Sequence, residues 1–212
     1  MTLTVSLRIA AYLMNLRDSD TVLEPSCGTG SLAVWAQTAG AAVATNEIDA
    51  RRRSLSELLG FAPTSHDAEF IDDFLPESIA PNVVLINPPF SSTGGRVERN
   101  RNKFGFRHVE SALRRLTSGG RFAVILGEGG SPGSVPGRRF WDSISPAIRV
   151  TRSISLPGRE YYRNGTTVGV TLILGRKSPV DGTEDAIPFI PVNHEPQSFE
   201  NVEEAFEAIG AE

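Results

Sequence analysis

Residues 21–47 of the chain read TVLEPSCGTGSLAVWAQTAGAAVATNE, and this stretch decides the fold. TVLEPS is a short apolar run that ends in turn residues, which is typical of a buried strand. SLAVWAQTAG, residues 31–40, has the pattern of a helix that Gly40 ends, and AAVATNE then gives a second strand. A strand, a tight glycine turn, a helix and another strand predict one unit of a parallel sheet with crossover helices.

The same alternation continues on both sides of this unit. Further strands are predicted at 61–67, 82–90, 121–127, 148–156 and 167–174, and helices at 3–16, 50–59, 106–117, near 138–145 and at 199–209. The strand at 61–67 is the weakest of these because it contains Pro63. The strands at 148–156 and 167–174 leave no room for a crossover helix, so they should pair antiparallel. We therefore expect an α/β fold with a mostly parallel seven-stranded sheet, an antiparallel last strand and helices on both faces.

Length and composition narrow the class of protein. The 212 residues suit one large α/β domain, and 40% hydrophobic with 22% charged residues is ordinary for a globular protein. There is no run of eighteen apolar residues and no signal-peptide pattern, so we expect a cytoplasmic protein without a membrane span. Cys27 is the single cysteine, which excludes an internal disulfide, and with three scattered histidines no metal site is expected.

Charge is divided unevenly along the chain. All 21 Lys and Arg residues lie within 1–177, and residues 178–212 carry none. The stretch 178–212 is acidic and contains four prolines. A basic body with an acidic tail is compatible with a nucleic-acid partner, despite the overall charge of −4. We predict a domain at 1–177 and an acidic, proline-containing tail or linker at 178–212.

The glycine-containing loop at 24–30 leaves the first strand and enters a helix. In sheets of this kind, ligands bind outside the carboxyl ends of the strands. Gly28 and Gly30 let the backbone turn tightly and approach a ligand, and the following helix N-terminus favours an anion. Because dinucleotide enzymes use similar loops and a plain tight turn looks the same, this motif alone remains ambiguous.

Acidic residues follow the second and third predicted strands. Glu47 is positioned to accept hydrogen bonds from the two hydroxyls of a ribose. The alternative is a structural role for this segment, in which the neighbouring Asp49 caps the following helix. Asp67 is a candidate acceptor for an adenine amino group, with Phe70 packing on the ring; a solvated loop aspartate is the other interpretation.

Asn87-Pro88-Pro89-Phe90 follows the apolar run VVLI and is the most informative motif. The prolines stiffen the chain, and the residue before a proline is held extended, which fixes Asn87 in orientation. The Asn87 side-chain oxygen and the Pro88 carbonyl can each accept one N–H of an amine. Phe90 offers a face for stacking a planar base. Such a site favours methyl transfer to an amine by positioning and electrostatics alone.

In this order and spacing, EPSCGTG, NEID, HDAEF and NPPF resemble the motifs of the N6-adenine-type, S-adenosylmethionine-dependent amino-methyltransferases. The resemblance spans roughly residues 20–175. It implies a Rossmann-like class I methyltransferase fold and S-adenosylmethionine as the cofactor. The strings NPPFSS and HVESALRRLTSGGRFAVIL also resemble methyltransferase domains joined to strawberry-notch-type helicases of phages and plasmids.

The resemblance assigns roles to individual positions. The implied catalytic residues are Asn87, Pro88, Pro89 and Phe90. The implied cofactor-binding residues are Glu24, Pro25, Ser26, Cys27, Gly28, Gly30, Glu47, Ile48, Asp67, Ala68 and Asn87.

Basic and aromatic residues in later segments are candidates for contact with a nucleic acid. Ser91–Arg107 carries five basic residues and one acidic one, and its Gly, Ser and Asn content suggests a loop. Basic side chains beside a flipped base neutralise phosphates, and tyrosines among arginines suit stacking. The predicted substrate-binding residues are Arg96, Arg99, Arg101, Lys103, Arg138, Arg139, Tyr162 and Arg163. A solvated loop and local packing of the tyrosines are the alternatives, and Arg51–Arg53 are expected to be solvated.

Three kinds of function are compatible with these observations. The leading hypothesis is a DNA adenine-N6 methyltransferase, as a module of a restriction-modification, defence or phage protein. No segment is long enough for a target-recognition domain, so either another domain or subunit provides recognition or the specificity is low. The second hypothesis is methylation of an RNA base or a protein glutamine, although glutamine enzymes usually have Tyr at the position of Phe90. The third is a cofactor-binding module without turnover; a nicotinamide dehydrogenase is more distant because no hydride-transfer acid or base is evident.

Overall fold

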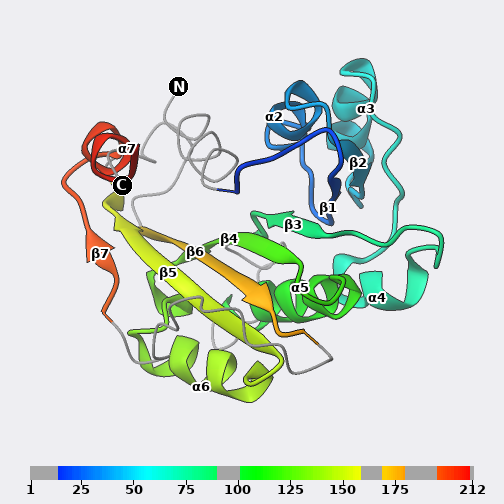
Figure 1. The fold of residues 1–212 in the computed structure, drawn as a ribbon. Helices are drawn as coiled ribbons and strands as arrows, with labels where there is room; N and C mark the ends of the chain where they lie inside the picture. Colours follow the sequence, from blue (N-terminus) through cyan, green and yellow to red (C-terminus); the bar gives the residue numbers. More distant parts are fainter. Residues whose placement is uncertain (1–13, 90–100, 159–168, 180–194, 211–212) are drawn as a thin grey trace.

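Strands and helices alternate along most of the chain (Figure 1). The computed structural model describes residues 14–89, 101–158, 169–179 and 195–210. Its elements are β1 (Thr21–Glu24), α2 (Ala33–Thr38), β2 (Ala42–Thr45), α3 (Ala50–Leu58), η1 (Ala68–Phe70), α4 (Ile71–Phe74), β3 (Val83–Ile86), α5 (Arg101–Arg115), β4 (Arg121–Gly127), η2 (Glu128–Gly130), α6 (Val135–Ile144), β5 (Ile148–Leu156), β6 (Val170–Lys177), β7 (Gln197–Ser198) and α7 (Val202–Gly210).

The strands form one seven-stranded sheet in the order β2-β1-β3-β4-β6-β5-β7. β2, β1, β3 and β4 pair in parallel, with crossover helices between them. β6 runs antiparallel to both β4 and β5, and β7 pairs in parallel with β5. The expected mostly parallel sheet with an antiparallel β5–β6 pair is confirmed.

The prediction of a strand at 61–67 is wrong. Only Thr64 forms a bridge there, to Asn46 of the β2 end. Pro63 has no N–H to donate to a ladder, and the Asn46 side chain accepts from the His66 N–H at 2.9 Å in place of a strand neighbour. The seventh strand is β7, within the stretch predicted as a tail.

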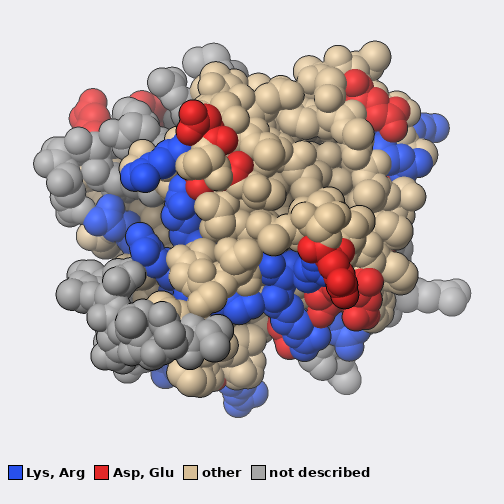
Figure 2. Space-filling model, turned by 45° about the vertical axis from the view of Figure 1, so that its right-hand side comes forward, with Lys and Arg blue, Asp and Glu red and all other residues tan. Residues whose placement is uncertain are grey.

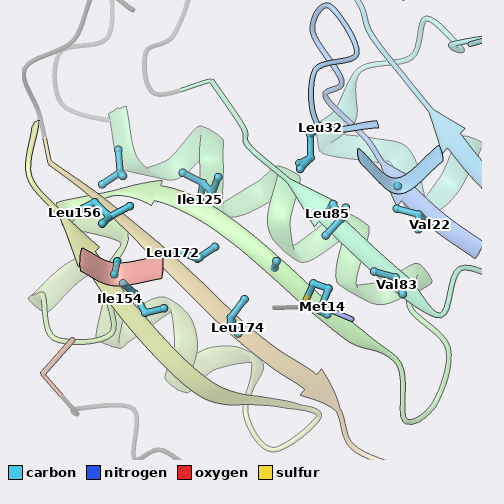
Figure 3. Close-up of a cluster of buried hydrophobic side chains, with 14 of the residues drawn as sticks. Met14, Val22, Leu32, Val83, Leu85, Ile125, Ile154, Leu156, Leu172 and Leu174 are labelled. Carbon is cyan, nitrogen blue, oxygen red and sulfur yellow. The ribbon is translucent and has the colours of Figure 1, made fainter. Parts of the chain in front are cut away.

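Two layers of apolar side chains cover the two faces of the sheet. On one face, side chains from β1, β3, β4, β5 and β6 pack together with α2 and α7 (Figure 3). On the other face, side chains of the central strands pack against α4, α5 and α6. Trp141 of α6 is 1% exposed and stacks on Phe122 of β4. Helices therefore cover both faces, as the sequence predicts.

Side-chain caps explain where two helices begin. Asp49 accepts from the N–H groups of Arg51 and Arg52 at 3.1 and 2.9 Å, which starts α3. Ser134 accepts from Gly137 N–H at 3.0 Å, and Pro136 stands in the first turn of α6. The capping role considered for Asp49 in the sequence is the one it has.

α5 begins at Arg101, five residues before the predicted helix start at 106. Residues 101–107 are therefore helical rather than part of the loop expected at 91–107. Gly105, which lowers helix propensity, lies in the interior of α5 and is buried. Tertiary packing thus outweighs the local signal in this segment.

The described part of the acidic tail packs on the sheet. β7 pairs with β5, and Val202 and Ala205 of α7 are fully buried in the same apolar layer as β1 and β4. The domain boundary at residue 177 stays a prediction, and most of the helix predicted at 3–16 lies outside the described residues. Within the described residues, no helix is both long and apolar enough to cross a membrane.

Candidate active site

The carboxyl ends of β1, β2 and β3 bring three polar side chains to one edge of the sheet. Glu24 ends β1, Glu47 lies two residues after β2, and Asn87 follows β3. β1 pairs in parallel with both β2 and β3, so these ends lie side by side. The sequence placed ligand-binding residues at this edge, and the fold brings the strand ends together there.

The loop after β1, residues 24–30, contains cofactor-binding residues predicted from the sequence and is called the cofactor loop below. Gly28 and Gly30 have φ angles of 57° and 84°, in the left-handed region that favours glycine. A Cβ on Gly30 would stand 3.2 Å from the ring of Phe61, whereas a Cβ on Gly28 would meet nothing within 4 Å. Gly30 therefore allows close packing, and Gly28 leaves its backbone accessible.

Glu47 is 4% exposed, and both of its carboxylate oxygens accept hydrogen bonds. Oε2 accepts from the Gly28 N–H at 2.8 Å, and Oε1 accepts from the Asp49 N–H at 2.8 Å. Oε1 also pairs with the Arg52 guanidinium at 3.0 Å. Arg51 and Arg52 are exposed, as expected, although Arg52 also pairs with Glu47. Arg53 is half-buried and donates to the Glu47 carbonyl at 3.0 Å.

Glu24 has a different environment from Glu47. It is 2% exposed, and its Oε2 has no hydrogen-bond partner in the part of the chain that the structure describes. Burial raises the pKa of Glu24 well above its usual range, the Ala33 N–H opposes that rise, and the nearby Glu47 charge adds to it. Two buried carboxyl groups thus lie at one edge: Glu47, whose oxygens accept three hydrogen bonds, and Glu24, whose pKa is raised by burial.

Asn46 organises this edge and was not selected from the sequence. It is 1% exposed, and its side-chain amide donates to the Pro25 and His66 carbonyls, both at 2.9 Å. Its oxygen accepts from Thr64 Oγ1 at 2.7 Å. Asn46 therefore fastens the cofactor loop to residues 64–66. The sequence signal for Asn46 was its position, as a polar residue directly after an apolar strand. The neighbouring Glu47 was interpreted as the functional residue instead.

The segment after Thr64 forms the outer side of the site. Asp67 is exposed and caps η1 by accepting from the Glu69 N–H at 3.0 Å, while Ala68 is 5% exposed. Two large apolar side chains nearby in sequence face solvent: Ile48 is 59% exposed and Phe70 is 46% exposed. Both side chains offer apolar surface to a ligand, and ligand sites are lined mainly by apolar and aromatic side chains.

The NPPF motif is described up to Pro89, and Phe90 lies outside the described residues. Pro88 is buried and Pro89 is exposed. The Asn87 Oδ1 atom is buried and has no hydrogen-bond partner within residues 14–89 or the other described ranges. A buried acceptor without a donor is costly, so its presence at a ligand-binding edge favours a donor supplied by a ligand.

Cys27 and His108 border the cofactor loop. Burial raises the pKa of the Cys27 thiol to about 12, and the Glu24 charge adds to the rise, which leaves the thiol protonated and unreactive. Ser26 Oγ lies 3.2 Å from Nδ1 of His108, on α5. His108 belongs to the stretch HVESALRR, which contributes to the family resemblance, but nothing in the sequence linked His108 to the cofactor loop.

The predicted substrate-binding residues are placed only in part. Arg96, Arg99, Tyr162 and Arg163 lie outside the described residues, and for Arg101 and Lys103 only the helical backbone is described. Arg138 and Arg139 are exposed, but they belong to α6 rather than to a loop, because the Ser134 cap starts the helix before them.

Acidic and basic side chains adjoin on the face of the molecule shown in Figure 2. On α5 the contacts are ion pairs, Arg107 with Glu69 and Arg114 with Asp72, both at 3.0 Å. These arginines are therefore partly neutralised within the protein. No group of three or more potential metal ligands occurs among the described residues.

The first part of the chain, which contains the candidate site, is similar to a known protein family. A family model described as the methyltransferase small domain matches residues 8–129. No match was found among curated proteins.

Solved structures share the fold at low sequence identity. A type I restriction-modification methyltransferase subunit from Streptococcus thermophilus has a TM-score of 0.68 and 16% identity, over 98% of this chain and 52% of its own. A Listeria monocytogenes protein assigned to the class I S-adenosylmethionine-dependent methyltransferases has a TM-score of 0.69 and 17% identity, over 100% of this chain and 68% of its own. A Pyrococcus horikoshii protein assigned as an RNA methyltransferase has a TM-score of 0.56 and 20% identity, over 83% and 84%.

At these identities the likeness shows the fold, which is the class I S-adenosylmethionine-dependent methyltransferase fold. The chain spans 44% of the EcoKI modification protein and 52% of the Streptococcus thermophilus subunit.

Proposed function

The chain belongs to the methyltransferase small domain family, and from this premise we propose that it methylates an exocyclic amine, with the N6 of adenine in DNA as the first candidate. The observation that carries the proposal is the unpartnered, buried Oδ1 of Asn87 at the carboxyl end of β3. An amine N–H is a donor of the kind this acceptor lacks.

The described residues fit S-adenosylmethionine, the cofactor of this family. Gly28 leaves open space at its backbone, where a ligand can approach. The unpartnered Glu24 Oε2 suits the cationic methionine end, and Glu47 stands where ribose hydroxyls bind in this fold class. Ile48 and Phe70 present exposed apolar surface, and Asp67 an exposed carboxylate, for the adenine.

In the proposed reaction the chain holds and orients the acceptor amine. Asn87 Oδ1 and the Pro88 carbonyl each accept one N–H of the amine, which directs the nitrogen lone pair away from both. S-adenosylmethionine supplies a methyl carbon activated by its positive sulfur. Transfer of this methyl group to the held nitrogen would form an N–C bond and break the S–C bond, and the extra proton on the nitrogen would leave to solvent. This mechanism needs no nucleophile from the protein, in keeping with the protonated Cys27.

A nucleic-acid acceptor is proposed from charge and from the relatives. The basic residues predicted to contact it are Arg96, Arg99, Arg101, Lys103, Arg138, Arg139 and Arg163, with Tyr162 for stacking. Solved neighbours include restriction-modification methyltransferase subunits and a protein assigned as an RNA methyltransferase. Because the chain spans about half of the restriction-modification subunits, we propose that another domain or subunit selects the target sequence. The association with strawberry-notch-type helicases remains a prediction from the sequence.

The test is transfer of labelled methyl from S-adenosylmethionine to unmethylated DNA, to RNA and to a glutamine-containing peptide in parallel. Label in DNA that Asn87→Ala abolishes supports the proposal. Leu58→Ala is the control, because Leu58 is 82% exposed on α3 and takes no part in the site. Label in RNA alone or in peptide alone would replace the substrate while retaining the reaction. No label with any acceptor, despite binding of the cofactor, would favour a binding module.

A further inference from the structure

Ser26 of the cofactor loop and His108 of α5 share a hydrogen bond, with 3.2 Å between Oγ and Nδ1. The two residues are 82 positions apart in the chain, so this bond joins separate parts of the fold. His108 is only 8% exposed. A partly buried side-chain hydrogen bond of this kind holds its two partners in one geometry.

The cofactor loop needs such external support. Gly28 and Gly30 are both in left-handed conformations, and glycine gives a backbone little stiffness of its own. On the β2 side, Glu47 holds Gly28 and Asn46 holds Pro25. On the α5 side, the described contact is Ser26 with His108.

α5 is itself fixed to the outer side of the site. Arg107 pairs with Glu69 at 3.0 Å, and Ser111 donates to the Asp72 carboxylate at 2.6 Å. The carboxylates of Asp67, Glu69 and Glu47 all lie close enough to His108 to act on its charge. The helix face that carries His108 therefore lies between the cofactor loop and the segment 67–72.

The same helix turn reaches the target segment. Gly105 is buried, and a Cβ placed on it would lie 3.6 Å from Cγ of Pro88, an ordinary packing distance. Residues 105–108 of α5 thus adjoin both the cofactor loop and the Asn87-Pro88 segment.

We propose that His108 is a positioning residue, which fixes Ser26 and with it the glycine backbone of the cofactor loop relative to the Asn87-Pro88 segment. The hold on the cofactor loop stands independently of the methyl acceptor. Only the statement that Asn87 and Pro88 receive an amine rests on the proposed function.

The test uses S-adenosylhomocysteine binding, measured by calorimetry on the full chain. His108→Ala and Ser26→Ala should each weaken binding about tenfold, the loss expected for one hydrogen bond to a buried site. The double variant should be no weaker than either single variant, because both remove the same bond. Ser143→Ala is the control for a serine substitution, because Ser143 is exposed on α6.

Two isosteric variants separate positioning from simple loss of packing. In His108→Asn the amide nitrogen or oxygen occupies the Nδ1 position and should restore binding to within about twofold of the wild type, since one hydrogen bond is regained. In His108→Gln the amide occupies the Nε2 position and should not restore binding. Circular dichroism and urea unfolding verify that each variant is folded.

The inference is overturned if the two single losses multiply in the double variant, if Gln restores binding as well as Asn does, or if His108→Ala binds like the wild type. Because the readout is ligand binding, it is separate from the question of whether DNA takes the methyl group. A wild type that binds ligand but methylates no DNA would contradict the proposed substrate and leave this test intact.

Discussion

Glu47 accepts a hydrogen bond from the Gly28 N–H at 2.8 Å, which ties the end of β2 to the cofactor loop. The acidic residue and the glycine motif are 19 positions apart, and each is ambiguous alone. Their contact means that the carboxylate proposed to bind the cofactor also shapes the loop. Changes at Glu47 should therefore affect stability and ligand binding together.

Glu47→Gln should lower the free energy of unfolding by about 1–3 kcal/mol, because one buried backbone donor then faces an amide N–H in place of a carboxylate oxygen. It should also weaken S-adenosylhomocysteine binding. Arg52→Ala is the matched control: the Arg52 side chain is 50% exposed, so breaking its pair with Glu47 should cost about 0–1 kcal/mol. Urea unfolding and calorimetry measure both effects. Equal, small losses for the two variants would contradict the role given to the Gly28 contact.

Asn46→Ala should destabilise the protein on the order of 3 kcal/mol, because it removes the hydrogen-bond partner of the buried Pro25 carbonyl and of the half-buried His66 carbonyl and N–H. The measurement is urea unfolding at neutral pH. Asn201→Ala, at the start of α7 where Asn201 accepts from the Glu204 N–H at 2.8 Å, is the control for loss of an exposed cap, with an expected cost of about 1 kcal/mol. If Asn46→Ala cost no more than this control, Asn46 would not organise the edge.

Glu24 should make stability fall as pH rises. Its folded-state pKa is raised by burial, so above the ordinary value of 4.5 the folded chain holds a proton that the unfolded chain has lost. Glu24→Gln resembles the neutral acid and removes this dependence. The stability of Glu24→Gln relative to wild type should therefore increase with pH from about 4.5 upward. A difference that stays constant between pH 4.5 and pH 8 would show that Glu24 is ionised in the folded protein.

His108 should make the stability of the protein fall as pH falls, the opposite of the effect of Glu24. Burial lowers its pKa, although the charges of Asp67, Glu69 and Glu47 oppose the shift. Below the ordinary value of 6.5 the unfolded chain binds a proton that the folded chain resists, so stability falls as pH falls. His108→Asn cannot titrate, and its stability relative to wild type should rise as pH decreases below 6.5. The comparison of unfolding curves at several pH values tests this, and a difference of the reverse sign would mean that the surrounding carboxylates dominate.

Much of the fold was predictable because its signals are local. The run RFAVILG, 121–127, coincides with β4, and the strand at 148–156 coincides with β5. The absence of a crossover between the last long strands predicted their antiparallel pairing, which β5 and β6 show. Apolar runs of this length bounded by turn residues leave few alternatives.

The errors arose where tertiary contacts decide the structure. The predicted strand at 61–67 is held as a loop by the Asn46 side chain, an interaction between residues about 20 positions apart. β7 is two residues long and is a strand only because β5 offers a free edge. Neither feature has a pattern that a single sequence displays.

In the candidate site, too, some features were predictable from the sequence and others were not. The strand-end positions of Glu24, Glu47 and Asn87 follow from the order of strands, so the sequence indicated them. Other features of the site depend on residues that are distant in sequence and close in space. These are the donors to Glu47, the unpartnered Oε2 of Glu24 and the contact of Ser26 with His108. For that reason the sequence did not single out Asn46 and His108, although Asn46 lies in NEID and His108 in HVESALRR.

The central claim is that Asn87 holds an adenine amine for methylation. The most direct measurement is the identity of the methylated nucleoside, by mass spectrometry of DNA digested after incubation with the protein and S-adenosylmethionine. We predict N6-methyladenine with the wild type and with Leu58→Ala, and a loss of at least about a hundredfold in rate with Asn87→Ala, in line with removal of a group that positions the reacting atom. A methylated nucleoside other than N6-methyladenine, or N6-methyladenine formed equally well by Asn87→Ala, would contradict the claim.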